Sequence, residues 1–260
     1  MIRSFNRFEL KYLLNTAQTG AVSADLLGFL SPDRHGEGGR YALTSLYYDS
    51  ADLACYWAKI DGLKVRRKLR IRHYESAVAL DPADPVFVEI KQRVNRVTQK
   101  RRVRLPYATA QSLCEGVEPD DVERADAPVV AEVVDMARRF DLRPTAITSY
   151  LRDAFVGGEL DPGVRVTFDR DLRYRTGNLD LHRKIPGAHL LPPDLVVMEV
   201  KVNDRVPIWL TRLVSHHNLT LVRISKYCAA IEAGRFRQAP SRISSLAPTR
   251  SYVPEEARHG

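Results

Sequence analysis

The 260-residue sequence has few cysteines and no long apolar run, and both shortages narrow what the protein can be. Its three cysteines, Cys55, Cys114 and Cys228, are an odd number without Cys-x-x-Cys spacing, which argues against a disulfide scaffold or a zinc site. Charges interrupt the amino terminus where a signal peptide needs an apolar stretch, and no later window could span a bilayer. We therefore expect a soluble, cytoplasmic protein.

Nucleotide-binding and hydrolase motifs are also missing. The sequence has no Gly-rich Walker loop and no Gly-x-Ser-x-Gly elbow, so neither a P-loop enzyme nor a serine hydrolase is predicted. What it does have is positive charge, with 40 Lys and Arg against 32 Asp and Glu and a formal net charge of +8. That balance predicts an anionic partner, which could be nucleic acid, an acidic membrane surface or a phosphorylated small molecule.

The chain length suits one large domain, which we place at 1–236. Residues 237–260 are rich in Pro, Ser and Arg without periodicity, so a flexible carboxy-terminal tail is predicted there. Alternating patterns predict eight strands, at 3–12, 41–49, 63–74, 86–93, 96–105, 144–156, 163–173 and 195–202. Helical spacing predicts helices at 16–29, 51–60, 107–115, 127–140, 206–217 and 225–233. We expect an α+β fold, an eight-stranded antiparallel β-barrel with helices packed on its outside.

The strand patterns place charge on one face of the predicted sheet. Side chains two residues apart share a face, so strand 63–74 sets Lys68, Arg70 and Arg72 on one side and Leu69 and Ile71 on the other. The same division is predicted for the strands that carry Glu9 and Lys11, Glu89 and Lys91, Lys100 and Arg102, and Glu199 and Lys201. Glu-x-Lys therefore recurs on three strands.

Two interpretations of this charged face are open. It could be the solvated side of a half-exposed sheet, which is the common case for any single strand. Arg and Lys dominate it, however, and the glutamates recur beside an ammonium two residues away, which suits the interior of a barrel that binds a polyanion through a metal ion. Such crowding of like charges destabilises the empty protein, so a bound anion or water would have to compensate.

The sequence resembles the polyphosphate polymerase domain family of vacuolar transporter chaperone (VTC) type, within the CYTH or triphosphate tunnel metalloenzyme superfamily. The resemblance runs from about Arg3 to Glu232 and depends on an ordered set of motifs. These are Arg7-Phe8-Glu9-Leu10-Lys11-Tyr12, Ser45-Leu46-Tyr47-Tyr48-Asp49, Leu69-Arg70-Ile71-Arg72, Val88-Glu89-Ile90-Lys91, Arg165-Val166-Thr167-Phe168-Asp169, Glu199-Val200-Lys201 and Ser225-Lys226-Tyr227. Eukaryotic members also carry an inositol-phosphate-sensing domain and membrane helices, patterns not seen in this sequence, which leaves a membrane or regulatory partner an open question.

The resemblance implies an eight-stranded tunnel in which ATP gives its terminal phosphoryl group to a growing polyphosphate chain, with Mn2+ or Mg2+ bound. The phosphate ligands that it implies are Lys11, Arg70, Arg72, Lys91, Arg152, Arg165 and Lys226, with Lys100 and Lys201 as further candidates. Among them Lys226, Arg152, Arg165 and Lys91 are the implied catalytic cations. Glu199 is the implied metal ligand, to which the face pattern adds Glu9 and Glu89.

Other functions compete with this one. Attack by water in the same tunnel gives an inorganic or nucleoside triphosphatase, and loss of turnover gives a non-catalytic polyphosphate-binding module. The basic run from Val65 to Arg70 suggests a nucleic-acid-binding module, but the aromatic residues of the sequence do not interleave with this run, so no nucleic acid is expected.

Single residues also have simpler interpretations. Lys226 could be a solvated residue at a helix start capped by Ser225, and Arg152 could form a surface ion pair with Asp153. The adjacent His216 and His217 are expected to point apart on a helix and to be structural.

Overall fold

The computed structural model describes residues 7–75, 80–95, 97–159, 161–183, 185–203 and 205–236. The predicted tail at 237–260 and the first residues of the predicted strand 3–12 lie outside these ranges. In the described ranges, no helix is long and apolar enough to cross a membrane.

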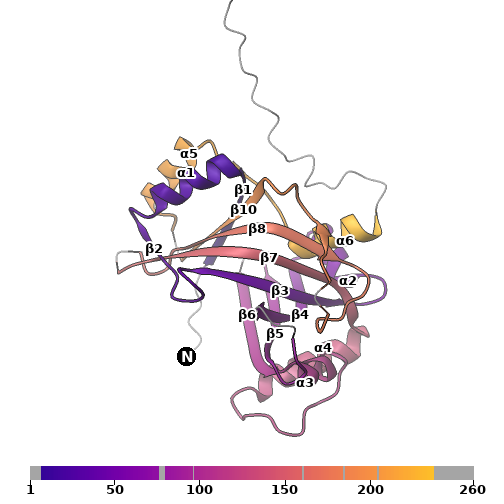
Figure 1. The fold of residues 1–260 in the computed structure, drawn as a ribbon. Coiled ribbons are helices and arrows are strands. Elements are labelled where there is room, and N and C mark those ends of the chain that lie inside the picture. The colour runs from indigo at the N-terminus through magenta and orange to yellow at the C-terminus, as the bar shows by residue number, and fades with distance from the viewer. Residues whose placement is uncertain are drawn as a thin grey trace, which may run out of the picture.

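The chain forms eleven strands and six helices in its described part (Figure 1). The strands are β1 (Arg7–Asn15), β2 (Leu30–Pro32), β3 (Arg40–Asp49), β4 (Val65–Glu75), β5 (Pro85–Val94), β6 (Val97–Pro106), β7 (Arg143–Gly157), β8 (Arg165–Arg175), β9 (Ala188–His189), β10 (Leu195–Asn203) and β11 (Thr220–Leu221). The helices are α1 (Thr16–Leu26), α2 (Ala54–Ile60), α3 (Tyr107–Cys114), α4 (Ala127–Phe140), α5 (Ile208–His216) and α6 (Lys226–Arg235). Each predicted strand and helix is present within a few residues.

All strands join one antiparallel sheet with the order β11-β1-β10-β8-β7-β3-β4-β5-β6, while β2 pairs with β7 and β9 with β8. The antiparallel sheet is confirmed, but a closed barrel of eight strands is not. No pairing joins β6 to β1 or β11 among the described residues, so the hydrogen-bonded ladder is open. The three extra strands, β2, β9 and β11, are too short to produce an alternating pattern.

The sheet nevertheless curls until its far strands meet through side chains. β1 and β5 are not neighbours in the sheet, yet Lys91 Nζ on β5 lies 3.0 Å from Glu9 Oε2 on β1. Figure 1 shows the same curl, since β4, β5 and β6 run steeply beneath β8, β7 and β3. The face that carries Glu9 and Lys91 is therefore turned inward, and we call it the charged face.

Apolar side chains cover the opposite, outer face as the alternation predicts. Near α1 and α5 the outer residues of β1, β8 and β10, such as Phe168 and Met198, pack with Leu26 and Leu210. Near α3 and α4 the outer residues of β4, β5 and β6 form a second cluster, which includes Leu69, fully buried. Full burial of one such side chain contributes about 1.5–3 kcal/mol.

Helix α6 departs from the predicted external placement. Tyr227 packs against Tyr47, and Ala229 packs among Leu13, Leu43 and Val197, all on the same side of the sheet as the charged face. Just before α6, the carbonyl of Ile224 accepts a hydrogen bond from Lys11 Nζ at 3.1 Å. The helix thus packs against inner-face residues at one end of the interior.

Candidate functional site

Each carboxylate of the charged face is held by cations from neighbouring strands. Glu9 accepts from Lys11 through Oε1 and from Lys91 through Oε2, both at 3.0 Å. Burial raises the pKa of Glu9, but these lysines outweigh burial and lower that pKa to about 2. Glu9 is therefore ionised at neutral pH, and both of its oxygens are occupied.

Glu89 forms a second group with residues of β4 and β6. Its Oε2 accepts from Arg70 at 2.6 and 2.9 Å, and its Oε1 accepts from Lys100 at 3.0 Å. Burial opposes ionisation, but Arg70 and the other nearby cations lower the pKa of Glu89 to about 2. Arg70 also donates to the Tyr47 hydroxyl at 3.0 Å, so Tyr47 rather than Tyr48 reaches the interior. This agrees with the strand alternation.

Asp169 forms a third group, and sequence reasoning assigned it no role. Arg152 donates to its two oxygens at 2.6 and 2.8 Å, and Lys226 Nζ lies 2.5 Å from Oδ2. Asp169 is fully buried, and burial raises its pKa, but Arg152 and Lys226 lower that pKa to about 2. Two features of the sequence could have indicated this role: Asp169 lies on the charged side of β8, two residues from Thr167, and it ends the motif Arg165-Val166-Thr167-Phe168-Asp169.

The simpler interpretations of Lys226 and Arg152 are therefore wrong. Ser225 does cap α6, since its side chain accepts from the Cys228 N–H, but the Lys226 side chain is only 9% exposed. Arg152 turns to the interior, whereas Asp153 pairs with Arg40 and Arg170. The alternation of β7 places neighbouring residues on opposite faces, which separates Arg152 from Asp153.

Glu199 differs from the other glutamates because the described residues give it one ion-pair partner, Lys201. Burial raises the pKa of Glu199, but Lys201 and Lys11 outweigh burial and lower that pKa well below the usual range. Burial lowers the pKa of Lys201 to about 8 despite its carboxylate partner. Glu199 is thus an ionised, buried carboxylate with fewer cation contacts than Glu9 or Glu89.

Two further arginines reach the interior. Arg72 is buried and donates to Ser45 Oγ at 3.0 Å and to the Tyr150 hydroxyl at 3.1 Å. Arg165 donates to the Tyr41 hydroxyl at 3.0 Å and pairs with Asp33. The predicted phosphate ligands therefore all direct their side chains into the interior, where these cations outnumber the carboxylates that pair with them. These ligands are Lys11, Arg70, Arg72, Lys91, Lys100, Arg152, Arg165, Lys201 and Lys226.

The three predicted metal ligands do not all belong to one group. Glu9 and Glu199 lie on adjacent strands, with Glu9 opposite Lys201 and Glu199 opposite Lys11, and the Glu199 charge raises the pKa of Glu9. Glu89 belongs to the separate group around Arg70. Buried, ionised carboxylate oxygens are the donors that Mg2+ and Mn2+ prefer, so the chemistry of Glu199 and Glu9 fits such an ion.

The histidine prediction needs correction. His216 ends α5 and His217 lies just beyond it, so the two rings do not diverge as they would inside a helix. Their centroids are 4.8 Å apart, and their ligand atoms lie within 4.8 Å of one another and of a carboxylate oxygen of Asp25. Asp25 and His216 are exposed, and we assign this group no function.

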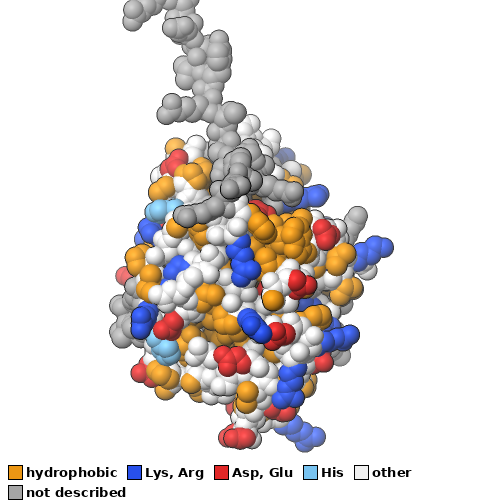
Figure 2. Space-filling view, turned by 90° about the vertical axis from the view of Figure 1, so that its right-hand side faces the viewer, with side chains coloured by type: hydrophobic (Ala, Val, Ile, Leu, Met, Phe, Trp, Pro, Cys, Tyr) orange, Lys and Arg blue, Asp and Glu red, His pale blue; other side chains and the backbone are white. Residues whose placement is uncertain are grey.

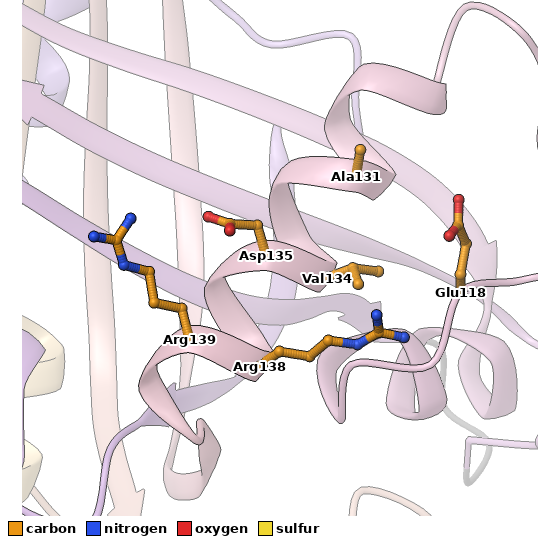
Figure 3. A pocket seen from close by; sticks show the side chains of 6 residues that line it. All are labelled: Glu118, Ala131, Val134, Asp135, Arg138 and Arg139. Atoms are coloured by element: carbon orange, nitrogen blue, oxygen red, sulfur yellow. The ribbon is translucent and has the colours of Figure 1, made fainter.

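A hollow on the outer surface is unrelated to the charged face. It lies beside α4 and is lined by Glu118, Ala131, Val134, Asp135, Arg138 and Arg139 (Figure 3). It carries two acids and two arginines, and Arg138 donates to the carbonyl of Gly116 at 2.8 Å. It therefore lacks the excess of cations found inside.

This chain has a curled antiparallel sheet with a basic, ion-paired interior, which is the arrangement of a tunnel fold. A Hippeastrum protein, described as having a dominant triphosphatase activity, shares this fold with a TM-score of 0.50 at 12% identity. The match covers 88% of this chain and 95% of that one. A Bacillus halodurans protein, provisionally classed as an adenylate cyclase, aligns with a TM-score of 0.48 at 13% identity over 84% of this chain and 92% of that one.

The chain belongs to the VTC domain family, which it matches over residues 6–234. This confirms the resemblance found in the sequence. No curated protein sequence matches the chain.

Proposed function

We propose that the protein is a metal-dependent polyphosphate polymerase that transfers the γ-phosphoryl group of ATP to a growing polyphosphate chain. The observation that carries this proposal is that the charged face holds many Lys and Arg side chains in place through ion pairs. Its cations are held in place by carboxylates at 2.5–3.0 Å, and a phosphate chain could take over those contacts. Membership of the VTC domain family supports the same function.

The residues can perform this reaction without a protein nucleophile. A terminal oxygen of the acceptor chain attacks the γ-phosphorus, and the bond from that phosphorus to the bridging oxygen of ADP breaks. Lys226, Arg152, Arg165 and Lys91 neutralise the negative charge that develops on the transferred group and on ADP. The remaining cations hold the rest of the phosphates.

Glu199, with Glu9 and Glu89 as further candidates, would hold the Mn2+ or Mg2+. The bound ion would supply further charge neutralisation for the phosphate oxygens. Glu9 and Glu89 each already have two cation partners, which leaves them fewer free lone pairs for a metal than Glu199 has. Glu199 is therefore the first residue to test.

A triphosphatase is the second candidate. If water takes the place of the acceptor chain, the same residues support hydrolysis, and a triphosphate that is hydrolysed does not need to thread past α6, which packs against inner-face residues at one end. The activity described for the Hippeastrum protein is of this kind.

Nucleic-acid binding has less support. In the basic run from Val65 to Arg70, Lys68 donates to Ser225 and Arg70 to Glu89, so both point inward. On the side of the molecule shown in Figure 2, acidic and basic side chains are interspersed rather than sorted into a basic stripe.

The test is incubation of the purified protein with ATP and Mn2+, with products resolved on a polyphosphate gel. We expect a ladder from the wild type and none from Glu199→Ala or Lys226→Ala. Arg143→Ala is the matched control, because Arg143 is an arginine with a 68% exposed side chain outside the interior. Orthophosphate alone would favour the triphosphatase, and bound ATP without any product would favour a polyphosphate-binding module.

A further inference from the structure

Three aromatic side chains share the charged face with the cations, at the end away from α6. On β4, Lys68 contacts Ser225 next to α6, and Arg70, Arg72 and then Tyr74 follow at two-residue steps on the same face. On β3, Tyr47 contacts α6, and Tyr41 lies six residues further away on the same face. Phe87 takes the corresponding place on β5, two residues before Glu89.

The Tyr74 ring contacts both of the other rings, and arginines flank Phe87 and Tyr41. The centroid of Tyr74 lies 5.7 Å from that of Tyr41 and 5.7 Å from that of Phe87. The guanidinium carbon of Arg102 lies 4.5 Å from the Phe87 ring centre, and Arg165 binds the Tyr41 hydroxyl. Tyr74 is 40% exposed although it belongs to an inward face, so part of its ring is available to a ligand.

We propose that Tyr41, Tyr74 and Phe87 form a platform that stacks the base of a nucleoside triphosphate. The inference rests on the proposed function, because it needs the triphosphate to lie on the cations. Residues two apart on a strand are about 7 Å apart, so Tyr74 lies one such step beyond Arg72. If the phosphates bind at Arg70 and Arg72, the sugar would lie alongside the step from Arg72 to Tyr74, and the base would contact the rings.

The platform makes the site selective for nucleotides over inorganic triphosphate. Removal of an aromatic ring on which a base stacks lowers the affinity for the nucleotide about tenfold or more. Tripolyphosphate has no base, so the same substitution leaves its binding unchanged. This difference separates a base platform from a general effect on the interior.

The experiment titrates the full chain by calorimetry with β,γ-imido ATP and, in parallel, with imidotriphosphate, both with Mn2+. We expect Tyr74→Leu and Phe87→Ala to weaken the nucleotide analogue about tenfold without changing imidotriphosphate, and Tyr74→Phe to bind as the wild type does. Phe140→Ala is the control, since Phe140 is an exposed ring on α4 with Arg139 over it.

Thermal unfolding of each variant checks that its fold is retained. Equal weakening of both ligands, or of neither, overturns the platform and leaves the proposed function standing. A wild-type protein that binds neither ligand overturns the proposed function, and the platform with it.

Discussion

Asp169→Asn tests whether the ion pairs of the interior hold the place of a phosphate chain. Asp169 is fully buried, and its carboxylate is the ion-pair partner of both Arg152 and Lys226, whose side chains are each 9% exposed. The amide keeps the shape of the carboxylate but removes its charge. Two buried cations then face each other without neutralisation.

The expected loss of stability follows from two independent figures. Removing one partner of a buried ion pair costs about 3–5 kcal/mol. The pKa of Asp169, about 2 against an ordinary 3.8, corresponds to about 2 kcal/mol, the same order of magnitude. For a chain of this size we expect the melting temperature to fall by about 10 °C.

Melting temperature measured against pH and tripolyphosphate checks the reasoning. Because the folded-state pKa is lowered, the stabilisation by Asp169 is complete above pH 3.8 and is lost as pH falls towards 2. The gap between wild type and Asp169→Asn should therefore narrow over that range. At neutral pH tripolyphosphate should stabilise the variant more than the wild type, since the anion supplies the missing charge.

Asp153→Asn is the matched control for this prediction. Asp153 lies on the side of β7 that faces away from the interior, and it pairs with two arginines there. Tripolyphosphate should stabilise this variant no more than it does the wild type. Equal melting temperatures for wild type and Asp169→Asn, or equal stabilisation of both by tripolyphosphate, would refute the reasoning.

Three further predictions follow from the same contacts. Burial raises the pKa of Tyr47, but Arg70 and other cations outweigh burial and lower that pKa to about 8. Tyrosinate absorbance should therefore rise near pH 8, and this rise should be missing in Tyr47→Phe. Leu69→Ala should cost about 2–5 kcal/mol in urea unfolding, because Leu69 is fully buried under α3 and α4; an unchanged midpoint would contradict that packing. Mn2+ should raise the melting temperature of the wild type and not of Glu199→Ala, an effect that chelation by EDTA reverses.

Much of the fold could be predicted from the sequence because alternation holds over most of each long strand, although register shifts interrupt the pairing of β7 with β3 and with β8. The division of Lys68, Arg70 and Arg72 from Leu69 and Ile71 is found in the structure as an inner and an outer face. Closure could not be predicted this way, because alternation tells which side a residue faces and not which strands pair at the edges. The short strands β2, β9 and β11 lack the length to alternate.

The site was predicted in its composition but not in its contacts. Asp169 was part of a quoted motif but was given no role, because a single aspartate on a strand has no repeating pattern and its partner Lys226 is 57 residues away in the sequence. The position of α6 was missed for a related reason. Its small residues, such as Ala229 and Ala230, give a weak amphipathic pattern that does not indicate which side of the sheet the helix covers.

If the protein has the proposed polymerase activity, the position of α6 at one end of the interior bears on the length of its product. With α6 packed at that end, donor and acceptor would enter from the same side, and ADP would leave along the route by which ATP arrived. If the helix stays in place, the polymer must back out after each addition, and synthesis is distributive, with many short chains growing together. If the helix withdraws, the polymer can advance through the protein, and a few long chains appear early.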